Sequence, residues 1–273
     1  MQAPGHAGLS LQARSTAVKR SLLLGGLDPS GGAGVTVDAT VVALHGGAPL
    51  PIALTTTIQG ARGFERAEPI PAAVWRQQLE VVLADGPVAA VKVGYIGAAA
   101  LAAEVGRALR DIAGSVPIVI DPVLSATAGG MDSGAALVRA YREHLAPVAT
   151  LITPNIPELE QLAEGMPERL LDLGAAAVLS KGGHASGPEV VDQLAERGAS
   201  SRFVRPRRSC GPVRGTGCAL ASAIAARLAR DEALRDACQG GGDWLSGLLE
   251  QVKPREDGAP QPLPISRAGT APR

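Results

Sequence analysis

The sequence G-G-L-D-P-S-G-G-A-G at residues 25–34 lies between a short apolar run and a helical stretch. We predict a buried strand over Ser21–Gly25 and a helix over Val35–His45. Glycines let a backbone adopt positive φ angles and approach a ligand closely, and the N–H groups at a helix start attract an anion or polar ligand. The stretch is therefore either a tight strand-to-helix connection or a binding loop, and the residues alone leave both interpretations open.

This turn is neither of the two common nucleotide-binding glycine motifs. A P-loop needs Lys followed by Ser or Thr at a fixed spacing, and no such pair follows here. The dinucleotide fingerprint G-x-G-x-x-G occurs nowhere in the chain. An oxidoreductase that binds a nicotinamide cofactor is therefore disfavoured.

Apolar runs bounded by Gly, Pro or Asp alternate with helical stretches along the chain. This alternation predicts an α/β fold with a mostly parallel central sheet and helices on both of its faces. Ligands of such sheets bind beyond the carboxyl ends of the strands, so residues that follow each apolar run are candidates for a site. The predicted strands are Ser21–Gly25, Ile52–Thr57, Ala89–Val93, Ile118–Ile120, Leu151–Thr153 and Ala176–Leu179, and the predicted helices are Val35–His45, Ala72–Leu83, Leu101–Ile112, Ser133–His144, Glu158–Glu164 and Cys218–Arg230.

Charge and composition disfavour several classes of partner. The 273 residues carry 26 Lys and Arg against 26 Asp and Glu, so there is no basic field to attract nucleic acid or anionic lipid. Aromatic residues make up 2%, too few for the stacking platforms of single-strand binders. Hydrophobic residues make up 46%, enough for a sizeable core. We expect no nucleic-acid and no membrane partner.

Cysteine usage and linker composition bear on location and domains. Three cysteines without a C-x-x-C pair are typical of a reducing compartment, and we expect a cytoplasmic protein without structural zinc. No linker-like change in composition interrupts residues 19–250, which we predict to be one domain. Residues 1–18 are expected to be a disordered N-terminus, and the proline-rich residues 251–273 a disordered tail.

A second glycine-rich turn, G-T-G-C at residues 215–218, leads directly into the last predicted helix. The successive amides of Gly215, Thr216 and Gly217 at a helix start suit the charge that develops on a transferred phosphoryl group. The same position is expected to lower the pKa of the Cys218 thiol, so that a thiolate accepts a proton from a substrate hydroxyl. A small cysteine that packs the helix start is the structural alternative.

Other polar residues follow the predicted strands. Asp121 is a carboxylate at a strand end, and Lys181 offers a cation to phosphates or is a solvated surface lysine. Asn155 and Glu158 have the spacing of a helix N-cap and its third helical residue, so the spacing alone favours a capping box over metal binding. His184 has no obvious Ser or Asp partner, and we interpret it as structural.

Six motifs follow one another along the chain. They are G-G-L-D-P-S-G-G-A-G (25–34), K-V-G (92–94), D-P-V (121–123), T-P-N-I-P-E (153–158), K-G-G-H (181–184) and G-T-G-C (215–218). Their order resembles that in the hydroxymethylpyrimidine/phosphomethylpyrimidine kinases of the ribokinase-like superfamily. The resemblance extends over about residues 21–249, essentially the whole predicted domain.

The resemblance implies a three-layer α/β/α sandwich and transfer of the ATP γ-phosphate to 4-amino-5-hydroxymethyl-2-methylpyrimidine, and then to its monophosphate, in thiamine biosynthesis or salvage. It implies that Gly215, Thr216 and Gly217 form the anion hole and that Cys218 occupies the position of the catalytic base. ATP and Mg²⁺ are the implied co-substrate and metal. Members of the family usually form homodimers, and the sequence leaves this assembly open.

The remaining site residues also come from the resemblance. Asn155 and Glu158 match the motif that organises Mg²⁺, mostly through water, and we add Asp121 as a third metal candidate. Lys181 is expected to face the nucleotide phosphates. Asp38 and Gln59 match positions that line the pyrimidine pocket, and a Gln amide suits adjacent amino and ring-nitrogen groups because it donates and accepts hydrogen bonds at once.

The sequence departs from the family pattern at four positions. Gly60 stands where Asn is common, Arg214 replaces the usual His, Tyr95 replaces a frequent Met, and Leu27 stands for Thr or Ser. These departures concern the identity of the substrate more than phosphoryl transfer. Pyridoxal kinase activity is the nearest alternative, because pyridoxal also carries a ring hydroxymethyl group. A ligand-binding relative without catalysis is a second one.

Overall fold

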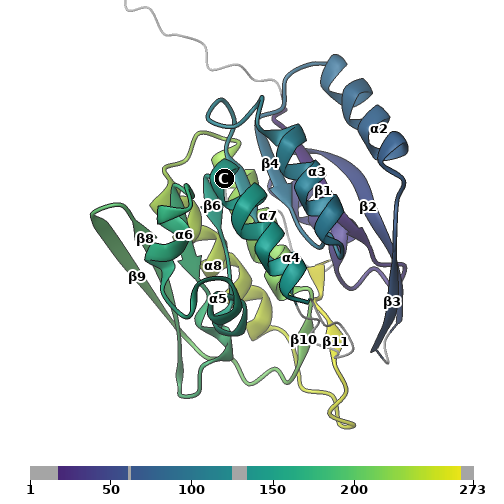
Figure 1. The fold of residues 1–273 in the computed structure, drawn as a ribbon. Helices are drawn as coiled ribbons and strands as arrows, with labels where there is room; N and C mark the ends of the chain where they lie inside the picture. The colour runs from purple at the N-terminus through teal and green to yellow at the C-terminus, as the bar shows by residue number, and fades with distance from the viewer. Residues whose placement is uncertain (1–17, 61–62, 125–133, 266–273) are drawn as a thin grey trace, which may run out of the picture.

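The computed structural model describes residues 18–60, 63–124 and 134–265. A nine-stranded sheet with the order β3-β2-β1-β4-β5-β6-β7-β8-β9 crosses its centre (Figure 1). The strands are β1 (Arg20–Leu27), β2 (Ala48–Gly60), β3 (Gly63–Pro69), β4 (Ala90–Val93), β5 (Ile118–Ile120), β6 (Leu151–Ile152), β7 (Ala177–Ser180), β8 (Glu189–Glu196) and β9 (Ala199–Pro206).

The six strands from β2 to β7 in the sheet order are parallel, and they correspond to the six predicted strands. The antiparallel strands β3, β8 and β9 at the two ends of the sheet were not predicted. Their sequences mix charged with apolar residues, because strands at the sheet ends are more exposed and need no continuous apolar run. A continuous apolar run, which identified the buried strands, therefore does not detect these three strands.

Helices cover both faces of the sheet, which confirms the predicted three-layer α/β/α architecture. One layer contains α1, α7 and α8, in which α7 packs against both of the others. The other contains α2 to α6. The helices are α1 (Gly34–Leu44), α2 (Ala72–Ala84), α3 (Ala99–Leu109), α4 (Ala135–Ala140), α5 (Ile156–Ala163), α6 (Pro167–Asp172), α7 (Thr216–Leu228) and α8 (Leu234–Glu250), and a π-helical turn at Tyr141–Leu145 extends α4.

Alternate residues of the buried strands pack against the helix layers on opposite faces of the sheet. In β5, Ile118 and Ile120 belong to a core cluster that includes Trp75 of α2, whereas Val119 packs with Leu220 of α7 on the opposite side. Strands buried on both faces carry apolar residues at every position. This is why the apolar runs of the sequence predicted them, with bounds correct to within two residues except in β2, which begins four residues earlier and ends three residues later than predicted.

The prediction of a disordered tail from residue 251 is wrong for residues 251–265. β11 (Gln261–Pro262) pairs in parallel with β10 (Val213–Arg214), and Leu263 and Ile265 are each only 6% exposed. These two side chains pack with residues of α1, α7 and α8, so the apolar residues among the prolines hold this segment on the domain. The predicted disorder of residues 1–17 and 266–273 lies outside the described residues. Within the described ranges, no helix has both the length and the apolarity of a membrane span.

His45, directly after α1, gives the fold a pH-dependent component. Its Nδ1 lies 2.9 Å from the Val41 carbonyl oxygen, and its ring packs edge-on against Trp244 with centroids 4.9 Å apart. Burial, with the nearby Arg227 and Arg230, lowers the pKa of His45. The unfolded chain therefore binds a proton at His45 more readily than the folded protein does. The neutral ring contributes fully to the stability of the fold above its unfolded pKa of about 6.5, and this contribution is lost as pH falls through its pKa in the folded state.

We expect Tm to fall between about pH 7 and pH 5 in wild type, and to fall less in His45→Gln, which retains a polar side chain but has no titrating ring. Differential scanning calorimetry of both proteins over this range measures the difference. An equal acid-induced loss of Tm in the two proteins would contradict a contribution from His45.

Candidate active site

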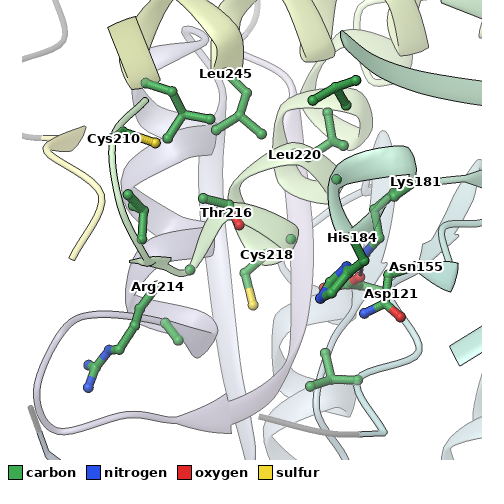
Figure 2. Close-up of a pocket in the computed structure, with 18 of the residues that line it drawn as sticks. Asp121, Asn155, Lys181, His184, Cys210, Arg214, Thr216, Cys218, Leu220 and Leu245 are labelled. Carbon is green, nitrogen blue, oxygen red and sulfur yellow. Dashed lines mark hydrogen bonds and ion pairs between the residues drawn. The ribbon is translucent and has the colours of Figure 1, made fainter. Parts of the chain in front are cut away.

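A cavity of about 470 Å³ lies at the carboxyl ends of the parallel strands. The residues that follow four of these strands line it: Asp28 after β1, Asp121 after β5, Asn155 after β6 and Lys181 after β7. Figure 2 shows Asp121, Asn155 and Lys181 together on one side of the cavity, with Cys218 next to them and Arg214 on the other side. The expectation that polar residues at the strand ends share one site is met for these side chains.

The two glycine-rich turns pack against each other at this cavity. Gly215 has a φ of +78°, and a side chain there would collide with the carbonyl oxygen of Gly32 in the first turn. α7 begins at Thr216, so its first unbonded N–H groups lie at the cavity. A Cβ at Gly217 would lie 3.4 Å from the Lys181 ammonium. The glycine thus keeps open the space between a helix start and a cation, which is where an anion would bind.

Lys181 is held in place by two carboxylates. Its Nζ lies 2.7 Å from Asp121 Oδ1 and 4.0 Å from Glu158 Oε2. Burial by itself would lower the pKa of Lys181, but the Asp121 and Glu158 carboxylates raise it. The ammonium is therefore charged at neutral pH and faces the cavity, which rules out the solvated-surface alternative for this side chain, only 11% exposed.

Asn155 and Glu158 form the capping box of α5 that their spacing favours. Asn155 Oδ1 accepts a hydrogen bond of 2.9 Å from the Glu158 N–H, and Glu158 Oε2 accepts one of 2.8 Å from the Asn155 N–H. Burial, together with the nearby Asp121 carboxylate, raises the pKa of Glu158 to about 7. A buried carboxylate with a raised pKa is a group whose charge a bound cation would stabilise.

The donor set fits Mg²⁺ bound mainly through water and phosphate. Mg²⁺ typically takes one or two carboxylates and keeps several waters, and Asp121 and Glu158 supply two carboxylates at the cavity. The amide oxygen of Asn155 is engaged in the capping box, which leaves Asn155 the weaker candidate. In the described part of the chain, no group of three or more His, Cys, Asp and Glu side chains could hold a metal by itself.

Cys218, at the start of α7, lies at the cavity as expected, but its acidity differs from the prediction. Burial raises the pKa of the Cys218 thiol to about 11, and this outweighs the Lys92 ammonium and the Gly34 N–H, which both favour the thiolate. The predicted lowering of this pKa is therefore wrong, because loss of hydration exceeds the effect of the helix start. The thiol is protonated in the resting protein at neutral pH.

The two residues assigned to the pyrimidine pocket have different surroundings. Gln59, in β2, lines the cavity together with Tyr95 and Thr57. The structure instead buries the Asp38 side chain in α1, where both of its oxygens accept hydrogen bonds from Lys92. Asp38 is not among the described residues that line the cavity, since the buried ammonium of Lys92 needs it as a counter-charge.

Two parts of the cavity were missed by the sequence analysis. His184, interpreted above as structural, is exposed at the cavity beside Lys181 (Figure 2), and its place after a strand end was the available signal. Apolar side chains of α7 and α8, including Leu220 and Leu245, line the other end of the cavity. No helix was predicted over α8, where Gly240–Gly242 weakens the helical signal.

Residues 28–260 match the protein family described as phosphomethylpyrimidine kinase. The chain belongs to this family. The match covers both glycine-rich turns and every candidate residue discussed above, apart from the first residues of the first turn. The phosphomethylpyrimidine kinase family is the one to which the motif order pointed, so the resemblance is confirmed.

Individual relatives agree with this membership. A thiamine biosynthesis bifunctional protein of Geobacter sulfurreducens is 36% identical over 245 residues, which are 85% of this chain and 49% of that protein. This chain thus spans about half the length of that relative. A hydroxymethylpyrimidine/phosphomethylpyrimidine kinase of Escherichia coli K12 is 30% identical over 249 residues, 87% of this chain and 93% of that protein. The ADP complex of Bacillus subtilis pyridoxal kinase has the same fold, with a TM-score of 0.80 at 22% identity over 92% of this chain and 99% of that chain.

Arg214 is a departure from the family pattern that the structure explains. Its guanidinium donates to the carbonyl oxygen of Gly60 at 2.5 Å and to Ser30 Oγ at 2.6 Å, and lies 3.5 Å from Asp28 Oδ2. Three segments of this phosphomethylpyrimidine kinase family member are therefore joined by one side chain, namely the G-T-G-C turn, the first glycine-rich turn and the end of β2. The hydrogen bonds of this guanidinium are thus made to protein groups.

We expect Arg214→Ala to lower the free energy of unfolding by about 1–3 kcal/mol, because the buried Asp28 carboxylate loses its nearby cation and the Gly60 carbonyl oxygen loses its donor. Chemical denaturation measures this change. Arg255→Ala is the matched control, since Arg255 forms an exposed ion pair with Asp257 and such pairs contribute little. Equal stability of Arg214→Ala and the control would show that the three segments do not depend on Arg214.

Proposed function

We propose that this protein transfers the γ-phosphoryl group of ATP to the hydroxymethyl group of 4-amino-5-hydroxymethyl-2-methylpyrimidine, and phosphorylates the monophosphate to the diphosphate. The observation that carries the proposal is the convergence of the G-T-G-C turn, the Lys181 ammonium and the Asp121 carboxylate in one cavity. Phosphoryl transfer needs this combination, because positioning and charge stabilisation supply most of its catalysis. Family membership and the names of the relatives support the same reaction.

At the phosphate end of the cavity, the start of α7 and Lys181 would stabilise the charge on the transferred group. Asp121 and Glu158 are the residues that would hold Mg²⁺, which neutralises phosphate charge when bound. Lys181 lies between these carboxylates and Gly217, so one cation connects the metal candidates with the anion hole. The apolar end near Leu220 and Leu245 is left for the nucleoside of ATP.

The first reaction forms a bond between the substrate hydroxyl oxygen and the γ-phosphorus and breaks the bond from that phosphorus to the leaving oxygen of ADP. In the second reaction a phosphate oxygen of the monophosphate forms the new bond, and the same bond to ADP breaks. The hydroxyl proton passes to the sulfur of Cys218 in its thiolate form. Since burial raises the pKa of this thiol to about 11, the thiolate is a minor form at neutral pH. Turnover is therefore tied to pH through Cys218.

Gln59 and Tyr95 supply the contacts for a small aromatic ring. The Gln59 amide can donate to a ring nitrogen and accept from an adjacent amino group. Tyr95 packs edge-on against Phe64, with 6.3 Å between ring centroids, and it lines the cavity beside Thr57. An amphipathic aromatic surface of this kind suits a pyrimidine ring with polar substituents.

The experiment that tests the proposal is ADP release from Mg-ATP with three acceptors offered separately: the hydroxymethylpyrimidine, its monophosphate and pyridoxal. We expect turnover on both pyrimidines. A higher kcat/KM for pyridoxal would overturn the substrate assignment and favour pyridoxal kinase activity, which the B. subtilis enzyme of the same fold has. Ligand binding without ADP release would overturn the kinase assignment itself. The cytoplasmic location and a homodimeric assembly stay predictions.

A further inference from the structure

The core beneath the cavity holds an ion pair that the proposed reaction does not use. Lys92 of β4 and Asp38 of α1 both have fully buried side chains. The Lys92 ammonium donates to Asp38 Oδ1 at 2.9 Å and to Oδ2 at 2.8 Å, and Ser222 Oγ of α7 donates to Asp38 Oδ1 at 2.8 Å. A pair this deeply buried is a poor source of stability, because removing two charges from water costs about as much as their attraction returns. Its presence calls for another explanation.

The helix geometry places this pair directly below Cys218. α1 and α7 pack against each other, and Ser222 follows Cys218 by four residues, just as Asp38 follows Gly34 by four. The N–H of Gly34 faces the Cys218 thiol, and Ser222 bonds to Asp38. The two helices thus meet at two successive levels, about one helical turn of 5.4 Å apart. Cys218 lies at the cavity level and the ion pair lies one turn below it.

The Lys92 ammonium keeps hydrogen-bonding capacity that Asp38 does not use. An ammonium has three hydrogens to donate, two are used by the oxygens of Asp38, and within the described ranges no third acceptor is found. A Cβ at Gly94 would lie only 2.6 Å from Lys92 Nζ, so this glycine gives the ammonium its space at the end of β4. The other charged groups near Cys218 are Asp121 and Lys181, from the ends of β5 and β7.

We propose that the buried Lys92–Asp38 pair controls how readily Cys218 forms a thiolate, with the ammonium favouring the thiolate and the carboxylate opposing it. Lys92 and Asp38 are positioning residues, since they act through Cys218 and do not line the cavity. The proposal extends the proposed function, in which Cys218 accepts the substrate proton. Removing either charge is then expected to change the reactivity of the thiol in opposite directions.

The test is the rate of Cys218 alkylation by iodoacetamide in the full-length protein without ATP or substrate. The pH is kept well below the pKa of the Cys218 thiol. Under these conditions the rate follows the thiolate fraction, and one pKa unit corresponds to a tenfold change. We expect about a tenfold or larger decrease in Lys92→Met and a comparable increase in Asp38→Asn. Peptide mapping by mass spectrometry separates Cys218 from Cys210 and Cys238.

Three controls separate a charge effect from loosening of the core. Ser222→Ala keeps both charges and should react close to the wild-type rate. Cys210 and Cys238, both buried, should keep their own rates in every variant, since loosening would raise all three. If Lys92→Met does not fold, the double variant Lys92→Met/Asp38→Asn, which has no net change in charge, should reverse the increase seen in Asp38→Asn. Parallel changes in the two single variants, or no change in either, would overturn the proposal.

The alkylation test is independent of the kinase assay. Opposite shifts in a protein that does not phosphorylate pyrimidines would support the ion-pair proposal and contradict the proposed function. Unchanged alkylation rates in variants of a protein that phosphorylates the pyrimidines would support the proposed function and contradict the ion-pair proposal.

Discussion

Cys218→Ala should lower kcat by about 10²–10⁴-fold, the usual cost of losing a general base. The methyl group of alanine retains the small volume at the start of α7 but has no atom that can accept the substrate proton. ATP binding should change far less, because the G-T-G-C amides and Lys181 remain in place. Steady-state kinetics with the hydroxymethylpyrimidine, together with titration of a nucleotide analogue, separates the two effects. A variant with wild-type kcat would reduce Cys218 to a packing residue.

The pH profile gives the same prediction a second readout. Since burial raises the pKa of Cys218 to about 11, the reactive thiolate increases about tenfold per pH unit in the range below that value. We expect the kcat of wild type to rise across the neutral and mildly alkaline range. Cys218→Asp, with a base that ionises at lower pH, should retain activity and have a flatter profile. Identical pH profiles of kcat for the two proteins would show that ionisation of the side chain at position 218 does not determine the rate.

The sequence predicted those parts of the site that depend on local patterns. The N-x-x-E spacing of Asn155 and Glu158 determines a capping box within one helical turn, and the apolar runs determine the parallel strands whose ends carry Asp121 and Lys181. Glycine-rich turns are equally local signals. Because parallel strands align their carboxyl ends, these separate patterns predict one shared cavity.

Properties that depend on distant residues were not predicted. The pKa of Cys218 depends on burial and on Lys92 and Asp38, which belong to β4 and α1. Arg214 contacts Gly60, which is 154 residues away along the chain. The apolar residues of the tail also bind a surface that the fold must first create. No local pattern contains these partners, so composition alone suggested disorder for the tail and the helix start alone suggested a reactive thiol.

Lys181→Met should lower kcat by about 10²–10³-fold, which is typical for removing one charge-stabilising donor from an active site. Methionine fills a similar volume but leaves no cation beside Gly217. The Asp121 carboxylate, which Lys181 contacts at 2.7 Å, then faces the ATP phosphates without its partner, so like charges add to the loss. Initial rates at saturating Mg-ATP and pyrimidine measure the effect.

Two substitutions show whether the position of the charge matters. Lys181→Arg restores a cation but not the compact ammonium that fits between Asp121 Oδ1 and Gly217, so we expect only part of the lost activity to return. Lys19→Met removes a lysine whose partner, Asp231, is largely exposed, and it should leave kcat unchanged. Because both Met variants lose one positive charge, a loss confined to Lys181→Met assigns the effect to the cavity and not to net charge. A kcat close to wild type in Lys181→Met would mean that the amides at the start of α7 stabilise the transferred group without this cation.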